Sequence, residues 1–319
     1  MDPGAFLDAA RLLIVAGKGG VGKTTVSAAL ARAVARRTRD TLLIEVEGKI
    51  GLAQAFGHAA LAYDEVMLHT GGGRSGEGAV RARHLTPDDA LLEYLHDHGL
   101  RRVSKRLVSS GALDVVATAV PGIRDILVLG KVKQLVRRNE SDVVVLDAPA
   151  AGHALTFLHS ARGLVDAVRV GPINAQATDV LQMLTDKERC QVVLVTLPEE
   201  TPVNELVETA YRLEDRVGVA LGPIIVNGMY PIIDHLDADP VAGAEAAGVM
   251  LRPGEAEVLS EAACFRRRRR QLQETQVARL AEELPLPQIH LPYLFTAGVG
   301  LAELDVLADA ILASGPVAA

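Results

Sequence analysis

A phosphate-binding loop is the strongest chemical signal in the sequence. The segment GKGGVGKTT, from Gly17 to Thr25, fills the pattern G-x-x-x-x-G-K-[ST]. Glycines let consecutive backbone N–H groups turn onto phosphate oxygens, and the helical pattern that follows adds the positive end of its dipole. In such a loop, Lys23 would neutralise charge on the β- and γ-phosphates, and the hydroxyl of Thr24 would bind Mg²⁺.

The context of this loop favours ATP and Mg²⁺ as ligands. The β-branched run RLLIVA precedes it and the alanine-rich pattern VSAALARAVARR follows it. A glycine-rich turn that carries a lysine by chance is the simpler alternative, and the complete order of strand, loop and helix disfavours it. The loop residues expected to contact the nucleotide are Gly17, Gly19, Gly20, Val21, Gly22, Lys23, Thr24 and Thr25.

The loop contains a second lysine, Lys18, that phosphate binding within one chain does not require. GKGGVGKT resembles the deviant phosphate loop of dimeric ATPases that include nitrogenase iron proteins, septum-site and partition ATPases and arsenite-pump ATPases. The resemblance implies that Lys18 reaches across a two-fold interface to the partner's nucleotide, in a dimer that closes on ATP. A solvated lysine at the tip of a loop is the alternative.

Composition and charge limit the classes of partner. The chain has 319 residues, a net charge of −7 and an isoelectric point near 5.7, which argues against a surface for nucleic acid or anionic lipid. Without a signal peptide pattern or an apolar run long enough to span a membrane, we expect a cytoplasmic protein with no stable membrane insertion. Cys190 and Cys264 are too few for a disulfide framework or a C-x-x-C metal site within one chain.

Nearly continuous apolar runs alternate with helical patterns along the chain. Because this alternation is typical of parallel strands buried on both faces, it predicts an α/β fold with a doubly wound, mostly parallel sheet and ligands at the carboxyl ends of the strands. The expected strands are residues 11–16, 41–47, 142–149, 191–197, 222–227 and 287–294. Helices are expected over residues 24–37, 202–216 and 300–313, among others.

We expect one domain, residues 1–319, interrupted by an insertion. About a hundred residues separate the second and third predicted strands, which is too many for a simple crossover. We therefore predict a mainly helical subdomain over residues 58–138, and Thr86 is expected to cap a helix within it. Five consecutive arginines, Arg266 to Arg270, lie in a later helical pattern without interleaved aromatic residues, which favours a solvated helix face over a nucleic-acid patch.

Most of the chain resembles one branch of these ATPases. The string DAPAAGHALTFL resembles the second switch of the arsenite-pump and tail-anchored-protein-targeting ATPases, and its matching residues are Asp147, Gly152, His153, Leu155, Phe157 and Leu158. That resemblance implies that Asp147 orients the water shell of Mg²⁺. It also implies that Asn227, in IIVN, reads the edge of adenine, and that the loop beginning LPYL, which includes Pro292, closes over the base.

The chain departs from this family at its first switch. Glu47 stands where the family has its water-polarising aspartate, and Gly48 replaces the proline that follows it. A glutamate can still act as a base or orient water if the backbone retracts. The two cysteines cannot build the family's arsenite site within one chain, and five methionines are few for a methionine-rich groove for membrane-protein clients.

Two functions remain open from the sequence. The first is a Mg²⁺-dependent ATPase that acts as a dimeric switch, in which Lys18, Lys23, Glu47 and Asp147 act on the γ-phosphate and a helical subdomain binds a protein client or partner. The second is a nucleotide-binding subunit that hydrolyses ATP weakly or not at all and pairs with a related, active ATPase. Either a homodimer or a heterodimer fits. An ATPase that patterns DNA or membranes is disfavoured, since the C-terminal helical segment is acidic.

Overall fold

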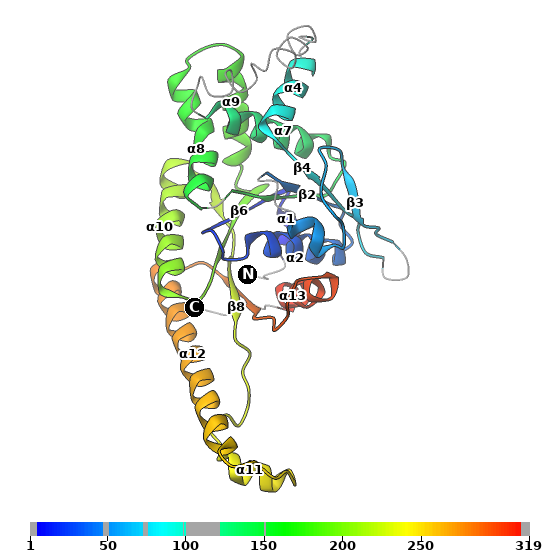
Figure 1. Cartoon of the computed structure of the whole chain (residues 1–319). Coiled ribbons are helices and arrows are strands. Elements are labelled where there is room, and N and C mark those ends of the chain that lie inside the picture. The colour runs from blue at the N-terminus through cyan, green and yellow to red at the C-terminus, as the bar shows by residue number, and fades with distance from the viewer. Residues whose placement is uncertain are drawn as a thin grey trace.

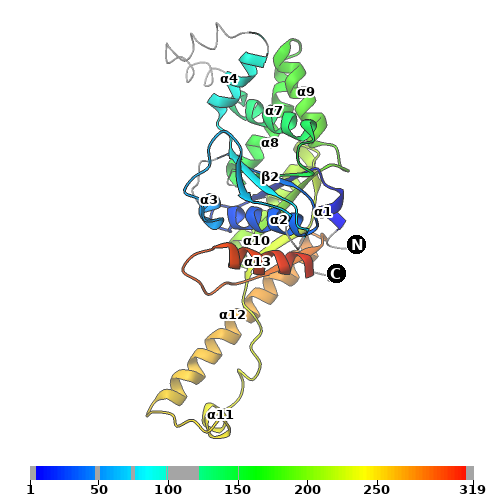
Figure 2. The same ribbon diagram turned by 90° about the vertical axis from the view of Figure 1, so that its right-hand side faces the viewer.

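A computed structural model describes residues 5–46, 51–72, 76–97, 99, 122–149 and 151–313. The described chain forms one nine-stranded sheet with helices on both faces, and a long arm that projects away from it (Figures 1 and 2). The predicted α/β fold with a mostly parallel sheet is therefore confirmed.

The strands run in the order β3-β4-β2-β5-β1-β6-β8-β9, with short β7 beside β6. Every pairing is parallel except that of β3 with β4. All six predicted strands are present, with bounds that differ by a few residues. The strands are β1 Leu12–Gly17, β2 Thr41–Glu45, β3 Val66–His69, β4 Val80–His84, β5 Val143–Asp147, β6 Cys190–Thr196, β7 Ala220–Leu221, β8 Ile224–Met229 and β9 Gln288–Pro292.

Strand β1 lies at the point where the strand order reverses. The chain leaves it towards β2 and β5 on one side, and later crosses to β6 on its other side. In open parallel sheets, ligands bind outside the carboxyl ends of the strands at this point. The loop that follows Gly17 therefore lies where the topology favours a ligand.

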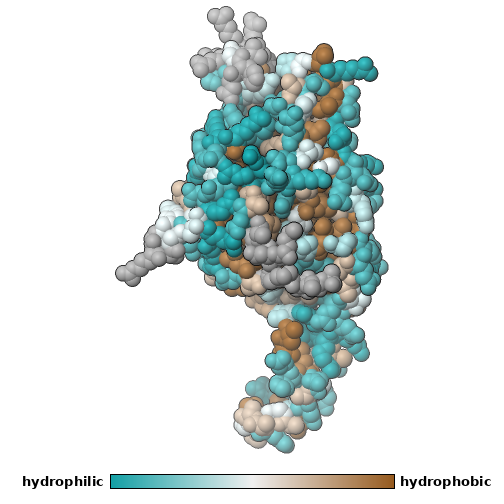
Figure 3. Space-filling view, turned by 180° about the vertical axis from the view of Figure 1, so that it is seen from behind, coloured by the Kyte–Doolittle hydropathy of each residue, from teal (hydrophilic) through white to brown (hydrophobic). Residues whose placement is uncertain are grey.

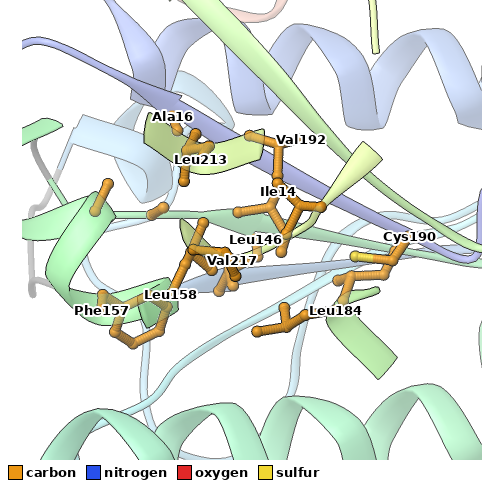
Figure 4. Packing of buried hydrophobic residues seen from close by; sticks show 14 of the residues in the cluster. Ile14, Ala16, Leu146, Phe157, Leu158, Leu184, Cys190, Val192, Leu213 and Val217 are labelled. Atoms are coloured by element: carbon orange, nitrogen blue, oxygen red, sulfur yellow. The ribbon is translucent and has the colours of Figure 1, made fainter. Parts of the chain in front are cut away.

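The helices form two layers because successive strand residues point to opposite faces. On one face, α2 and α13 pack with α1 and α3 against Leu13 and Val15 of β1. On the other face, α7, α8, α9 and α10 pack against Ile14 and Ala16, part of the core drawn in Figure 4. These helices are α1 Ala5–Ala9, α2 Lys23–Arg36, α3 Gly51–Ala55, α7 Ile123–Arg138, α8 Ala151–Ala167, α9 Pro172–Leu184, α10 Glu200–Arg216 and α13 Leu301–Ala313.

The segment predicted to be a helical insertion is only partly helical where it is described. Its first part forms β3 and β4, which extend the main sheet as an antiparallel hairpin at its edge. Helix α4, Pro87–Asp97, follows and begins as predicted, with the Thr86 hydroxyl accepting a bond of 3.1 Å from the N–H of Asp89. Helix α7 completes the described part. The domain boundaries themselves stay a prediction.

A partly buried ionic network joins α4 to α7. Glu93 of α4 accepts hydrogen bonds from Lys131 of α7 and from the hydroxyl of Tyr63. Burial would raise the pKa of Glu93, but the hydrogen bonds from Lys131 and Tyr63 outweigh it and hold the pKa below its usual value. The contact between Lys131 and Glu93 ties α4 to α7.

Residues 230–272 are here called the arm. They lead from β8 into the part of a long helix that lies farther from the sheet. The arm contains α11, Pro240–Ala246, and the first part of α12, Glu255–Glu283, whose last part lies along α10 (Figure 1). At its base, the guanidinium of Arg266 stacks 4.2 Å from the centre of the Tyr230 ring and 4.8 Å from that of Phe295. Arg270 donates to the carbonyl of Tyr230, while Arg267 and Arg268 are exposed. Arg269 also pairs with Glu199, at 3.4 Å. The arginine run is thus a solvated face only in part, since three of its members contact other parts of the chain.

Among the helices that the structure describes, none combines the length and the apolar character that a membrane span requires.

Candidate functional site

The glycine-rich loop connects the carboxyl end of β1 to the first residue of α2. Gly20 and Gly22 have φ angles of +86° and +89°, in the left-handed region that glycine adopts at little cost. A Cβ atom at Gly17 would lie 2.3 Å from the carbonyl oxygen of Val195 on β6, so the loop begins where two strands are in close contact. The first N–H groups of α2 have no partner within the helix and are available to an anion.

Two features favour glycine at position 22, its positive φ angle and the close approach of Asn227, and they give a prediction for the loop. A Cβ atom there would lie 2.4 Å from Nδ2 of Asn227, whereas nothing lies within 4 Å of a Cβ at Gly20. Gly20→Ala should therefore cost only backbone strain, about 1–2 kcal/mol of unfolding free energy. Gly22→Ala adds the clash and should cost about 2–5 kcal/mol.

Denaturant unfolding of both variants tests this difference. Adding Asn227→Ala to Gly22→Ala should recover part of the lost unfolding free energy, because it removes the clashing amide. Equal losses for Gly20→Ala and Gly22→Ala would show that the close approach of Asn227 does not restrict position 22.

The two lysines of the loop take different directions. Lys23 is buried, and its amine donates a hydrogen bond of 3.1 Å to the carbonyl of Lys18, within the loop itself. The amine of Lys18 instead forms an ion pair of 2.6 Å with Glu205 of α10. Their side chains are 37% and 41% exposed, so this pair lies at the surface and is open to competition by another charged group.

Asp147, the last residue of β5, joins the loop helix to the neighbouring strand. Its carboxylate accepts a hydrogen bond of 2.8 Å from the hydroxyl of Thr24 and one of 3.2 Å from that of Ser27. Asp147 is buried, so these contacts fix where the carboxylate lies. A hydroxyl and a carboxylate at the head of a phosphate loop are hard oxygen donors of the kind that Mg²⁺ prefers, and Thr24 and Asp147 fit the predicted metal site.

A second carboxylate lies next to Asp147. Glu45, at the end of β2, is the register partner of Asp147 on β5. Both residues occupy strand positions that face α2. Oε2 of the buried Glu45 lies 3.7 Å from Nδ1 of His84 on β4. The carboxyl ends of three adjacent strands therefore place two acids and a histidine in one row beside the loop helix.

The two residues predicted to contact adenine lie at the ends of β8 and β9. Nδ2 of Asn227 donates a hydrogen bond of 2.9 Å to the carbonyl of Val21, which brings it directly against the phosphate loop. Pro292 is the register partner of Met229 and ends β9 on the same edge of the sheet. The fold thus gathers Asn227 at the loop, with Pro292 on the neighbouring strand.

His153 lies in the first turn of α8. Burial raises the pKa of Asp125, in α7, above its ordinary value, and His153 acts in the opposite direction.

Two further predicted residues lie in the loop and at the start of α2. Gly19 is exposed at the tip of the loop, and Thr25 lies half-buried in the first turn of α2. Glu47 lies outside the described residues, so the predicted role of this side chain remains a prediction.

Two residues that touch the predicted site residues were not singled out from the sequence. Ser27 lies three positions after Thr24 on α2, so helical spacing alone could have placed it on the same face. Glu205 is separated from Lys18 by 187 positions, and no local pattern joins them. Only the packing of α10 beside the loop brings this glutamate to the lysine.

Comparisons with known proteins show which family the sequence resembles. Residues 10–170 match the family described as "Anion-transporting ATPase". The chain is 33% identical to "ATPase BagA" of Mycobacterium tuberculosis (strain H37Rv), over 97% of this chain and 94% of that protein. It is 29% identical to "ATPase get3" of Schizosaccharomyces japonicus over 55% of this chain and 54% of that protein, and 27% identical to "ATPase get3" of Neurospora crassa over 62% and 55%.

The match to the family spans the phosphate loop, Asp147 and the segment that follows it, and the similarity to one relative extends over nearly the whole chain. This chain therefore belongs to the anion-transporting ATPase family.

Proposed function

We propose that the protein is a Mg²⁺-dependent ATPase that works as a dimeric switch and couples its nucleotide state to movement of the helices above the sheet. The observation that carries this proposal is the contact between Thr24 of the loop helix and Asp147 of β5. It joins the residues expected to bind phosphate and Mg²⁺ to the segment that resembles the second switch. A change in the bound phosphates would therefore shift the start of α8.

Each residue of the site has a role in this proposal. The backbone of residues 17–22 and the first turn of α2 bind the phosphates, and Lys23 neutralises their charge. Thr24 and Asp147 hold Mg²⁺, which when bound offsets charge on the β- and γ-phosphates. Asn227 and Pro292 are proposed to contact the base. Glu47 is proposed to orient the attacking water.

Movement would be transmitted through α8 to α7. Asp147 ends β5, α8 begins four residues later, and α8 packs against α7 in one hydrophobic core. Helix α7 is tied to α4 through Lys131 and Glu93. These contacts support a transmission of the nucleotide state to α4 and α7, where we place the binding of a protein client or partner.

We also propose that the protein acts in the cytoplasm, as a homodimer or paired with a related ATPase. Cys190 and Cys264 are unpaired, which suits a reducing compartment. Burial raises the pKa of Cys190 to about 12, so this thiol is not a reactive group at neutral pH.

Lys18 must leave Glu205 before it can reach a partner's nucleotide. Exposed ion pairs contribute about 0.2–1 kcal/mol, so Glu205→Gln should lower the ATP concentration for half-maximal dimerisation by about 1.4- to 5-fold. Lys18→Ala should keep ATP binding but lose ATP-dependent dimerisation and turnover. Sedimentation velocity and phosphate release, each over a series of Mg·ATP concentrations, measure both effects.

Glu208→Gln is the matched control. Glu208 lies on the same helix and pairs with Arg212 rather than with the loop, so its replacement should not change dimerisation. If Lys18→Ala dimerised and turned over ATP like the unchanged protein, Lys18 would have no role across the interface.

The replaced first switch supports a second function. With Glu47 and Gly48 in place of the family's aspartate and proline, the chain could bind ATP without efficient hydrolysis and regulate a related, active ATPase. Glu47→Gln separates the two functions in a phosphate-release assay. A loss of about 100-fold in turnover would place Glu47 in the chemistry. Tight ATP binding by the unchanged protein without turnover, or turnover that survives Glu47→Gln, would contradict that role.

A further inference from the structure

The arm carries an apolar stripe that no described part of the chain covers. Val258, Phe265 and Leu272 of α12 are 64%, 65% and 58% exposed. They are spaced by seven residues, which is nearly two full helical turns, so they lie on one side of the helix. Gln273 and Leu280 are buried and mark a different side, the one that packs on the body of the protein. The projection of the arm and its surface are visible in Figures 2 and 3.

The charges beside this stripe are ordered along the arm. Residues 231–262 contain seven carboxylates and one arginine, whereas residues 263–270 contain five arginines and no acid. Glu261 and Arg268 are seven residues apart, lie on the same flank of the stripe and are exposed. No ion pair joins either of them to another residue in the described ranges. The arm is therefore acidic towards its tip and basic towards its base.

This pattern is complementary to itself when two arms run in opposite directions. Phe265 is the midpoint of the stripe, since Val258 and Leu272 each lie seven residues from it. A two-fold axis at Phe265 therefore places Val258 opposite Leu272 of the other arm, and Glu261 within one residue of the level of Arg268. Two arms in parallel would instead place Glu261 against Glu261 and Arg268 against Arg268 of the other copy, which is unfavourable.

From this complementarity we infer that the arm binds a second copy of the same chain, through antiparallel pairing of two α12 helices about Phe265. The contact uses neither the phosphate loop nor Lys18, so it forms without nucleotide. It is distinct from the ATP-dependent dimer proposed above. Because three anchor side chains make a small interface, the pairing is weak.

Sedimentation velocity of the full chain without nucleotide tests the association. At about 100 µM, the mass should rise from that of one chain towards that of two, and Phe265→Glu should weaken association at least tenfold because two carboxylates would meet on the axis. Val306→Glu on α13 is the matched control, since Val306 is also an exposed apolar helix residue. A monomeric unchanged protein at this concentration, or equal effects of both variants, would overturn the inference.

The charge pairs can be tested with two single variants that weaken association and a double variant that restores it. Each interface contains two Glu261–Arg268 pairs, worth about 0.2–1 kcal/mol each, so Glu261→Arg should weaken association about 2- to 30-fold. Arg268→Glu should do the same, and the variant carrying both changes should regain association because the pairs re-form with their charges exchanged. Failure of the double variant to recover would contradict this pairing.

Disulfide cross-linking distinguishes antiparallel from parallel pairing of the two helices. In a Cys264→Ser background, Leu272→Cys places the two thiol positions about 21 Å apart in the antiparallel pair, so they should not cross-link. Adding Val258→Cys should give a cross-linked dimer that reductant reverses. Cross-linking of the Leu272→Cys variant alone would mean parallel arms and overturn the inference. Lys18→Ala should lose ATP-dependent dimerisation without changing these cross-linking results. The ATP-dependent dimer and the pairing of the arms are therefore tested separately.

Discussion

Lys23→Ala should weaken ATP binding about 10- to 100-fold and reduce turnover about a thousandfold. A hydrogen bond to a charged group contributes about 1.5–3 kcal/mol to binding. The larger loss in turnover follows because the lysine lies in a loop that the fold holds in place, and removing one such donor from a transition state costs about 10²–10³ in rate. Isothermal titration with ATP and phosphate release measure the two effects.

A structural consequence of the same change must be separated from its effect on ATP. Lys23 is buried and donates to the carbonyl of Lys18, so alanine leaves that carbonyl without this donor, at a cost of about 1 kcal/mol. Lys133→Ala is the matched control, because Lys133 is a buried lysine of α7 paired with Asp179. It should lower the melting temperature and leave ATP binding intact. ATP affinity that is unchanged in Lys23→Ala would show that the nucleotide binds elsewhere.

Asp147→Asn should allow ATP to bind but lower Mg²⁺-dependent turnover by about 10²–10³. Asparagine keeps the shape of the side chain and one acceptor oxygen, so either Thr24 or Ser27 can still donate to it. The negative charge that would hold Mg²⁺ beside the phosphates is lost. We therefore expect the Mg²⁺ concentration for half-maximal turnover to rise, in addition to the loss in maximal rate.

Ser27→Ala distinguishes charge from hydrogen bonding at this position. It removes the 3.2 Å bond to Asp147 and leaves the 2.8 Å bond from Thr24. A neutral hydrogen bond contributes about 0.5–1.5 kcal/mol, so turnover should fall by no more than about tenfold. Asp147→Asn with unchanged Mg²⁺ dependence would remove Asp147 from the metal site, whatever its effect on stability.

The alternation of apolar runs and helical patterns was sufficient to predict the fold. Parallel strands such as β1 and β5 are buried on both faces, so their sequences are nearly continuously apolar and are recognisable without any long-range contact. The two strands of the β3–β4 hairpin were not predicted. Its strands, VMLH and VRARH, carry polar residues, and β3 forms the edge of the sheet, so no comparable apolar run marks them.

The arginine run shows the limit of composition as a guide. As a sequence, RRRRR indicates a charged surface, and Arg267 and Arg268 are indeed exposed. Arg266 instead stacks on Tyr230 and Phe295, which come from two other parts of the chain. Helical spacing fixes which arginines share a side of α12, but the identity of the partner on that side depends on the tertiary fold.

By itself, the sequence determined the phosphate loop, its neighbouring strand and helix, and the position of Asp147 at a strand end, because these depend on residues close together in the chain. Only the tertiary structure decided that Thr24 and Ser27 both donate to Asp147, that Glu205 holds Lys18, and that the side chain of Asn227 lies against Val21. The physical reason is that the register of parallel strands and the packing of distant helices bring these side chains together, and neither is encoded in local spacing.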